Sequence, residues 1–209
     1  MYTCANCSVY SCDQPDHDRM PQNCPMRNDS VMKEAFEGYW DMKDFYVTAS
    51  EMEAIGYCEW PRLREIIELC QRMPFDKIGI AFCKGLKKEA AVINRILKSY
   101  HLNVVSVICK TGGISKERVG IREECKLHPG EFEPMCNPIA QASLLNEQKT
   151  QFNIAVGLCV GHDSLFFQHS EAPVTVLIAK DRVLAHNPVG AVYCADGYFK
   201  KMFTPPEKT

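Results

Sequence analysis

The sequence predicts an α/β protein of three layers, in which helices cover both faces of a mostly parallel sheet of four or more strands. Two observations lead to this prediction. After Pro74, short aliphatic segments alternate with segments of helical periodicity, and the short segments are apolar along nearly their whole length. Parallel strands that are buried on both faces have this composition, and they need a crossover helix between them.

The aliphatic segments define the expected strands. They are residues 77–83, 104–109, 153–159 and 174–179. A helix is expected between the first two, because apolar residues recur there at spacings of four, three and four. Asn137-Pro138 and Asn187-Pro188 each predict a helix start, since asparagine is a good cap and proline fits the first helical turn.

Helices are also expected before Pro74. Residues 30–57 have room for two helices, and a third is expected to begin at Pro61. The chain is therefore expected to divide into a cysteine-rich metal-binding segment, a helical segment packed on the core, an α/β domain and a tail. Their predicted bounds are residues 1–29, 30–74, 75–203 and 204–209, with the tail expected to be frayed.

Composition limits the classes of function. A hydrophobic content of 46% over 209 residues is enough for a core. The formal net charge of -2 and the pI near 6.3 give no basic field, so nucleic acid is not expected as a partner. No long apolar run or secretory leader pattern is present, so we expect a cytoplasmic protein with no membrane partner. An unidentified small molecule or redox partner is expected, and the oligomeric state stays open.

Four of the twelve cysteines fall within the first 24 residues: Cys4, Cys7, Cys12 and Cys24. In a reducing compartment such a density favours metal ligation over a disulfide framework. A pair spaced Cys-x2-Cys can bind one ion, and two further thiolates complete a tetrahedron. Zinc and a [4Fe–4S] cluster both accept four cysteines. Both stay open, with His17 as an alternative ligand.

A second group of cysteines closes the predicted strands. Cys83, Cys109 and Cys159 each stand at the carboxyl end of one strand, and Cys136 directly precedes an expected helix start. Ligands of open parallel sheets bind beyond these strand ends. If the strands are neighbours, the four thiols can form a second metal or iron–sulfur site. The competing interpretation is that the thiols are core residues, which we expect for Cys58, Cys70 and Cys194.

Other chemistry-bearing residues adjoin the strand ends. His162 and Asp163 follow Cys159 where a helix should begin, so His162 is a candidate ligand or proton-transfer group and Asp163 a candidate cap. The turn Lys110-Thr111-Gly112-Gly113 could offer a lysine and backbone N–H groups to an anion or cofactor. Lys180-Asp181-Arg182 is expected to form a solvated turn.

Several of these motifs together resemble one family. They are Cys4-x2-Cys7-x4-Cys12, Asn23-Cys24-Pro25-Met26, the turn from Cys109 to Gly113, Cys136-Asn137-Pro138, the stretch from Gly157 to Phe166, and the runs from Ala172 to Thr175 and from Lys180 to Pro188. The chain is similar over nearly its whole length to the domain of unknown function 1847 family. The resemblance implies a bacterial or archaeal cysteine-rich, metal-binding protein, and it brings no reaction or substrate.

Three functions are compatible with these observations, and whether the protein is an enzyme stays open. The first is a metalloprotein with two thiolate sites that serves redox or cofactor-dependent chemistry. The second is a thiol enzyme in which the amino-terminal site holds structural zinc and His162 assists Cys159 as nucleophile. The third is a metal-dependent binding or sensing module without catalysis.

Overall fold

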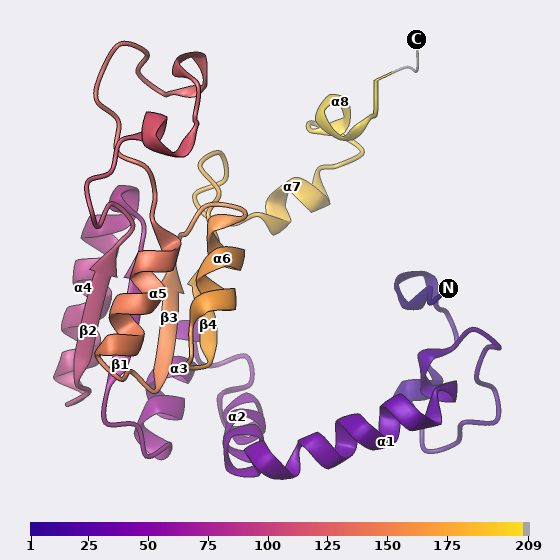
Figure 1. Cartoon of the computed structure of the whole chain (residues 1–209). Coiled ribbons are helices and arrows are strands. Elements are labelled where there is room, and N and C mark those ends of the chain that lie inside the picture. Colours follow the sequence, from indigo (N-terminus) through magenta and orange to yellow (C-terminus); the bar gives the residue numbers. More distant parts are fainter. Residues whose placement is uncertain (207–209) are drawn as a thin grey trace. The chain divides into compact units, whose positions relative to one another are not determined.

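The computed structural model describes residues 1–206, and its central element is a four-stranded sheet (Figure 1). The strands are β1 (Ile78–Phe82), β2 (Val104–Ile108), β3 (Phe152–Val156) and β4 (Val174–Ile178). Their order is β2-β1-β3-β4, and each neighbouring pair is parallel. The expected α/β class is confirmed, although each strand ends before its predicted last residue.

Helices connect and precede the strands. The α-helices are α1 (Asp29–Gly38), α2 (Lys43–Gly56), α3 (Arg62–Arg72), α4 (Lys87–Ser99), α5 (Pro138–Glu147), α6 (His162–His169), α7 (Val189–Tyr193) and α8 (Lys200–Phe203). Short 3-10 helices occupy Cys4–Asn6, Ser11–Asp13, Pro25–Arg27, Trp40–Met42, Lys84–Leu86, Lys116–Val119 and Glu123–Cys125. The helices expected after Pro61, Asn137 and Asn187 are therefore present.

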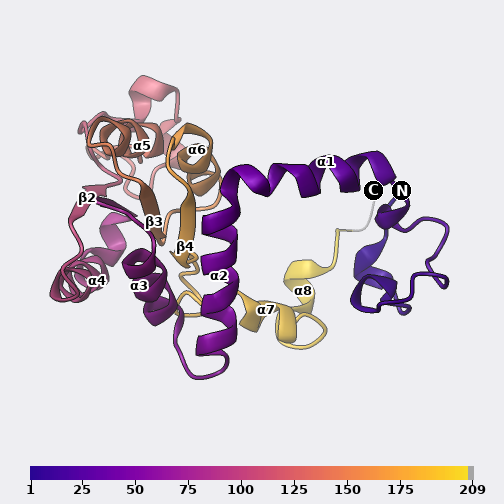
Figure 2. The same ribbon diagram turned by 90° about the horizontal axis from the view of Figure 1, so that it is seen from below.

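The sheet is the middle of three layers. Figure 2 shows α3 and α4 on one face and α5 and α6 on the other. Two apolar side chains of β1, Ile78 and Ile80, and two of β3, Ile154 and Val156, are fully buried. Burial on both faces explains why these strands read as unbroken apolar runs. On the α5 and α6 side, a core cluster joins the two helices to β1 and β3.

The chain forms two compact units, Met1–Ile55 and a second that begins at Gly56 and contains the sheet. Within the described part of the first unit, Ser11 and Met52 are the buried residues. Asn28 caps α1, because its side-chain oxygen accepts a hydrogen bond from the backbone N–H of Val31 at 3.4 Å. This unit thus has helices but almost no core of its own.

The carboxyl-terminal region contains α7 and α8. The Thr204 hydroxyl donates to the carbonyl of Lys200 at 2.8 Å, which closes the last turn of α8. Part of the expected frayed tail, residues 207–209, lies outside the described residues. Within residues 1–206, no helix combines the length and the apolar character needed to cross a membrane.

Candidate functional site

The candidate site lies where the chain connections diverge at the carboxyl edge of the sheet. β1 leads through α4 to β2 on one side, whereas β3 leads through α6 to β4 on the other. The central neighbours β1 and β3 therefore form a topological switch point, where the crevice beyond the strand ends commonly binds ligands. Cys83 directly follows β1, and Cys159 follows β3 after two further residues. The strand adjacency on which the predicted thiol site depended is present.

Backbone hydrogen bonds place Cys109 and Cys136 at the same edge. The N–H of Cys109 donates to the carbonyl of Phe82 at 2.9 Å, which extends the pairing of β1 and β2. The N–H of Asn137 then donates to the carbonyl of Cys109 at 2.7 Å, and the Asn137 side chain caps α5. The start of α5 is thereby fixed beside the end of β2, which brings Cys136 next to Cys109.

Gln141 on α5 holds the two strand ends in register. Its side-chain amide nitrogen donates to the carbonyls of Phe82 and Val107 at 3.2 and 2.8 Å. Phe82 immediately precedes Cys83, and Val107 lies two residues before Cys109. Gln141 is fully buried, so its hydrogen bonds form away from competing water. It positions the edge of the sheet that carries the thiols.

The thiols surround one small cavity. It has a volume of about 10 Å³ and is lined by Cys83, Cys109, Cys136, Gln141, Leu158, Cys159 and His162. Two side-chain atoms of this group, Gln141 Oε1 and His162 Nδ1, are buried and have no hydrogen-bond partner within the described chain. A buried polar atom without a partner is costly. The cavity therefore combines four thiols with two polar atoms that have no hydrogen-bond partner among the described residues.

Hydrogen bonds between the thiols bias their charge states. The Cys109 thiol, by hydrogen bonding, lowers the pKa of Cys83 and the pKa of Cys136 below the ordinary cysteine value. Lys180 further lowers the pKa of Cys83. The pKa of Cys109 itself is raised, first by its hydrogen bond to Cys136, then by that to Cys83 and by burial. Cys109 thus serves as the proton donor between two groups that favour the thiolate.

Two basic residues after β4 complete the edge. The guanidinium of Arg182 donates to the sulfur of Cys159 at 3.1 Å, and this hydrogen bond raises the pKa of Arg182. Lys180 interacts with Cys83, as its effect on that thiol shows. Arg182 is exposed and lies in a turn, as the sequence predicts, whereas Lys180 is half-buried. The contacts of these two residues with the thiols were not predicted from the sequence. The signal was available, because they follow a parallel strand as the cysteines do.

In the described residues, neither group of cysteines has its sulfur atoms arranged for metal binding. Among residues 1–206, no three or more His, Cys, Asp or Glu side chains are arranged so that they could hold a metal ion. At the sheet edge the thiols hydrogen-bond to one another, with the backbone N–H of Lys84 donating to Cys109 sulfur at 3.3 Å. Ligation there would require these side chains to rotate toward a common centre.

His162 and Asp163 lie at the start of α6, as expected. Their backbone N–H groups donate to the carbonyl of Cys159 at 2.9 and 3.1 Å, so Cys159 and His162 are held within one turn. The carboxylate of Asp163 accepts from the N–H of Ser164 at 2.8 Å in the first helical turn. The N-cap of α6 is Gly161, so Asp163 is an acidic residue of the first turn and not the expected cap. His162 lines the thiol cavity.

The turn from Lys110 to Gly113 uses much of its hydrogen-bonding capacity internally. The N–H of Thr111 donates to the carbonyl of Ile108 at the end of β2, and the N–H of Gly113 donates to the carbonyl of Lys110. Lys110 Nζ donates to the carbonyl of Pro134 at 2.5 Å. Gly112 and Gly113 have positive φ angles, as a tight turn requires. Lys110 lines a larger pocket beside the thiols, whereas the other three residues do not.

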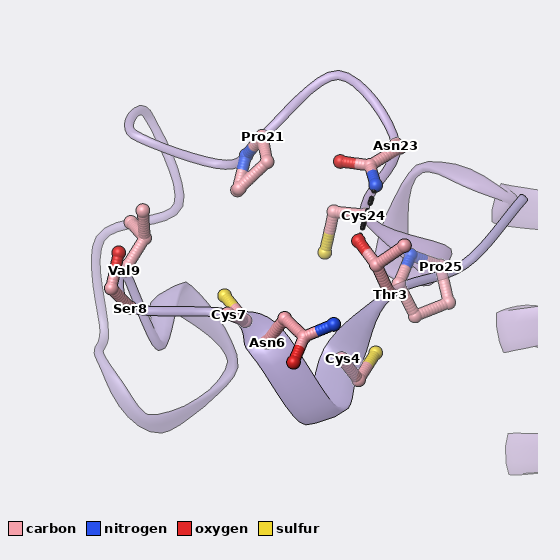
Figure 3. A pocket seen from close by; sticks show the side chains of 10 residues that line it. All are labelled: Thr3, Cys4, Asn6, Cys7, Ser8, Val9, Pro21, Asn23, Cys24 and Pro25. Carbon is pink, nitrogen blue, oxygen red and sulfur yellow. Dashed lines mark hydrogen bonds between the residues drawn. The ribbon is translucent and has the colours of Figure 1, made fainter. Parts of the chain in front are cut away.

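The amino-terminal cysteines form a second, separate cluster. Cys4, Cys7 and Cys24 line one pocket of about 220 Å³, and the sulfur atoms of Cys7 and Cys24 point into it (Figure 3). Backbone N–H groups of Tyr10 and Val9 lower the pKa of Cys7. Amide donors of this kind stabilise a thiolate. Cys12 is exposed and does not line the pocket, and His17 is exposed as well.

The cysteines expected in the core behave differently from one another. Cys70 on α3 is buried, and burial raises its pKa to about 12. Cys58 and Cys194 are exposed, so that expectation was wrong for both. Cys58 lies in the turn after α2 with a positive φ, and Cys194 ends the short helix α7. Neither position is enclosed by the sheet and its helices.

Fold and site together define a parallel α/β protein with a thiol-rich crevice at the carboxyl edge of its sheet. The chain belongs to the family described as "Protein of unknown function (DUF1847)", whose model matches residues 24–177. A relative from Methanocaldococcus jannaschii, described as "Uncharacterized protein MJ0455", is 52% identical over 151 residues, which are 72% of this chain and 76% of the relative. The expected family is confirmed. The matched range begins at Cys24, after the first three cysteines.

Proposed function

We propose that this protein binds a soft metal ion or an iron–sulfur cluster through Cys83, Cys109, Cys136 and Cys159, and uses it for redox or cofactor-dependent chemistry in the cytoplasm. The observation that carries the proposal is the convergence of four thiols, from four separate places in the chain, on one cavity. Thiolate sulfur selects zinc and iron–sulfur clusters among biological metals. The reducing cytoplasm would keep these thiols available as ligands.

The surroundings of the thiols support ligation. Metals bind the thiolate form, and the pKa values of Cys83 and Cys136 are lowered. Lys180 and Arg182 supply positive charge beside the sulfur atoms, which would offset the charge of a tetrathiolate site. His162 Nδ1 and Gln141 Oε1 have no hydrogen-bond partner among residues 1–206, and both residues line the same cavity. Either group could contact a ligand or a metal-bound water.

We propose a second metal site, holding zinc or a [4Fe–4S] cluster, at Cys4, Cys7, Cys12 and Cys24. Three of these residues already line one pocket. The short helical turn Ser11–Asp13, which carries Cys12, would have to move toward them. A segment with almost no buried apolar side chains gains its stability most readily from a metal.

The test is metal and acid-labile sulfide analysis of protein purified without oxygen. We expect the wild type to contain metal, Cys83→Ser to lose the content of the sheet-edge site, and Cys4→Ser to lose that of the amino-terminal site. Cys58→Ser is the matched control, because Cys58 is exposed and lies in neither cluster. Iron with sulfide would identify a cluster, and iron-free protein with zinc would identify zinc sites. Wild-type protein without either metal would contradict the proposal.

One observation favours a second function, that of a thiol enzyme with Cys159 as nucleophile. The Arg182 guanidinium, 3.1 Å from the Cys159 sulfur, would stabilise a thiolate there, and His162 begins the next helix. This function requires Cys159 to react with iodoacetamide faster than the exposed Cys58 does, and Arg182→Gln to remove the difference.

A further inference from the structure

A larger pocket adjoins the thiol cavity. Its volume is about 690 Å³, and Cys83, Cys136, Cys159 and His162 line both spaces. Its outer wall comes from the segment between β2 and α5, which extends from the carboxyl end of the sheet (Figure 1). Pockets that hold small molecules have volumes of roughly 300–1,000 Å³. The pocket is therefore large enough for an organic ligand whose end reaches the thiols.

Among the carboxylate and basic side chains of the pocket, the basic ones are in excess, although the thiols of Cys83 and Cys136, whose pKa values are lowered, add negative charge to the same wall. Its lining contains one carboxylate, that of Glu133, and five basic residues: Lys84, Lys110, Lys116, Lys180 and Arg182. Glu133 is already engaged, because it forms an ion pair with Lys116 and accepts from the backbone N–H of Leu127 at 2.8 Å. These contacts, first of all the one with Lys116, lower the pKa of Glu133, so its carboxylate stays charged.

The other cations of the pocket are not held by carboxylates in the described part of the chain. Within residues 1–206, no ion pair to Asp or Glu involves Lys84, Lys180 or Arg182. Lys180 and Arg182 instead contact the thiols Cys83 and Cys159. Several positive charges in a concave site concentrate anions there. Charge-assisted hydrogen bonds to a carboxylate or a phosphate are also strong.

Apolar side chains form the rest of the wall. They include Val119, Ile121, Leu127, Met135 and Ile139. Val119 and Leu127 are exposed, so this part of the pocket presents apolar surface to solvent. A ligand that matches both halves has an anionic group at the sheet edge and an apolar body against the β2–α5 segment.

We propose that this pocket binds a small organic anion, in which a carboxylate or phosphate is joined to an apolar body. The anion contacts Lys180 and Arg182, with Lys84 at the rim, and the ligand lies beside Cys159 and His162. The inference names the substrate class of the proposed thiol site and rests on it for the chemistry. Recognition of the anion itself needs only the basic side chains and no metal.

The test is a titration of the full-length protein, followed by amide chemical shifts, with three probes of similar size: phenyl phosphate, benzoate and benzyl alcohol. We expect saturable binding of at least one anion and none of the alcohol. Replacing a cation that hydrogen-bonds an anion removes a charge-assisted contact, so Lys180→Gln and Arg182→Gln should each weaken binding about tenfold or more. Arg182→Lys should retain part of the affinity. Tighter binding of phenyl phosphate or of benzoate would identify the phosphate or the carboxylate class.

Two variants guard against misfolding and general charge effects. Lys84→Gln changes an exposed side chain of the pocket and should also weaken binding, while Lys98→Gln changes an exposed lysine of α4 outside the pocket and should not. No saturable binding of either anion would overturn the inference. Equal affinity in Arg182→Gln, Lys84→Gln and Lys98→Gln would also overturn it.

Metal content measured on the same samples separates this inference from the proposed function. Anion binding by a wild type that holds no metal would retain the anion pocket and reject the metal site. A wild type that holds metal but binds neither anion would retain the metal site and reject the anion pocket. If Lys180 and Arg182 only balance thiolate charge, their replacement lowers the metal content and no anion binds the wild type.

Discussion

A single side chain, the Cys109 thiol, influences the charge of two neighbours. It hydrogen-bonds both Cys83 and Cys136, and in each case this contact is the largest cause of the lowered pKa. Cys109 is buried, with 3% of its surface exposed, so water competes little for its proton. The reactivity of Cys136, which is half-buried and lines the larger pocket, therefore depends on a residue that solvent does not reach.

Removing this donor should slow the reaction of Cys136. In chelator-treated protein at about pH 6.5, we expect iodoacetamide to modify Cys136 through its thiolate. Cys109→Ala removes the hydrogen bond, which raises the pKa of Cys136 and lowers the thiolate fraction at that pH. Because the pKa of Cys136 is lowered to about 5 in the wild type, the thiolate fraction is nearly complete at that pH. Once the pKa of the variant exceeds the pH, each further unit reduces this fraction, and hence the rate, by about tenfold. Mass spectrometry of the Cys136 peptide measures the rate.

The matched control for this prediction is Cys109→Ser, whose hydroxyl can still donate a hydrogen bond. It should retain most of the wild-type rate, and the rate at the exposed Cys58 should be the same in all three proteins. Equal Cys136 rates in Cys109→Ala and the wild type would show that the thiol hydrogen bond does not control the thiolate.

At the scale of elements, the turn after β3 depends on close approach to the helix that follows β1. Gly157 has a φ of 63°, and a Cβ atom there would lie 2.0 Å from Leu86 Cδ1. Leu86 is buried at the end of the 3-10 helix Lys84–Leu86. The position therefore requires glycine for two reasons: the backbone is left-handed, and a side chain would collide with Leu86.

Gly157→Ala should lower the free energy of unfolding by about 2–4 kcal/mol, from the left-handed backbone and the overpacking together. Gly161→Ala is the control, because Gly161 has a φ of 82° but no atom lies within 4 Å of the place that a methyl group would occupy. Its cost should be that of the backbone alone, about 1–2 kcal/mol. Urea denaturation measures both values, and equal costs for the two variants would exclude a packing role for Leu86.

The elements themselves could be predicted from sequence because burial leaves a strong pattern. β1 and β3 are covered on both faces, and their apolar runs indicated both the strands and the parallel class. The rule that ligands gather at carboxyl strand ends then placed Cys83, Cys109 and Cys159 together. The neighbouring order of the strands could not be read from the chain, because it depends on contacts between distant segments.

The missed residues show where local patterns fail. Lysine and arginine are residue types that usually lie in water, so the sequence predicted exposed side chains at Lys180 and Arg182. Their contacts with Cys83 and Cys159 arise only when β4 packs beside β3. Cys58 and Cys194 have the composition of core residues but lie at the ends of helices, where the chain leaves the packed layers. Side-chain type alone does not distinguish these situations.

At the scale of the whole molecule, the two compact units differ in what can stabilise them. The second unit has a core in which Ile78, Ile80, Ile154 and Val156 are fully buried. In residues 1–28, Ser11 is the buried residue, and the cysteines there form no disulfide within the described chain. Burial of apolar surface can stabilise the sheet, whereas the amino-terminal segment has little such surface to bury.

Hydrogen exchange should separate these two sources of stability. In chelator-treated protein, amides of β1 and β3 should exchange slowest and those of residues 1–28 fast, since exchange follows local opening. Zinc added without oxygen should slow exchange in residues 1–28, because binding to four thiolates contributes folding free energy directly. Cys4→Ser should abolish this effect and leave β1 and β3 unchanged. Strong protection of residues 1–28 before zinc is added would mean that the segment is held by packing and does not need a metal.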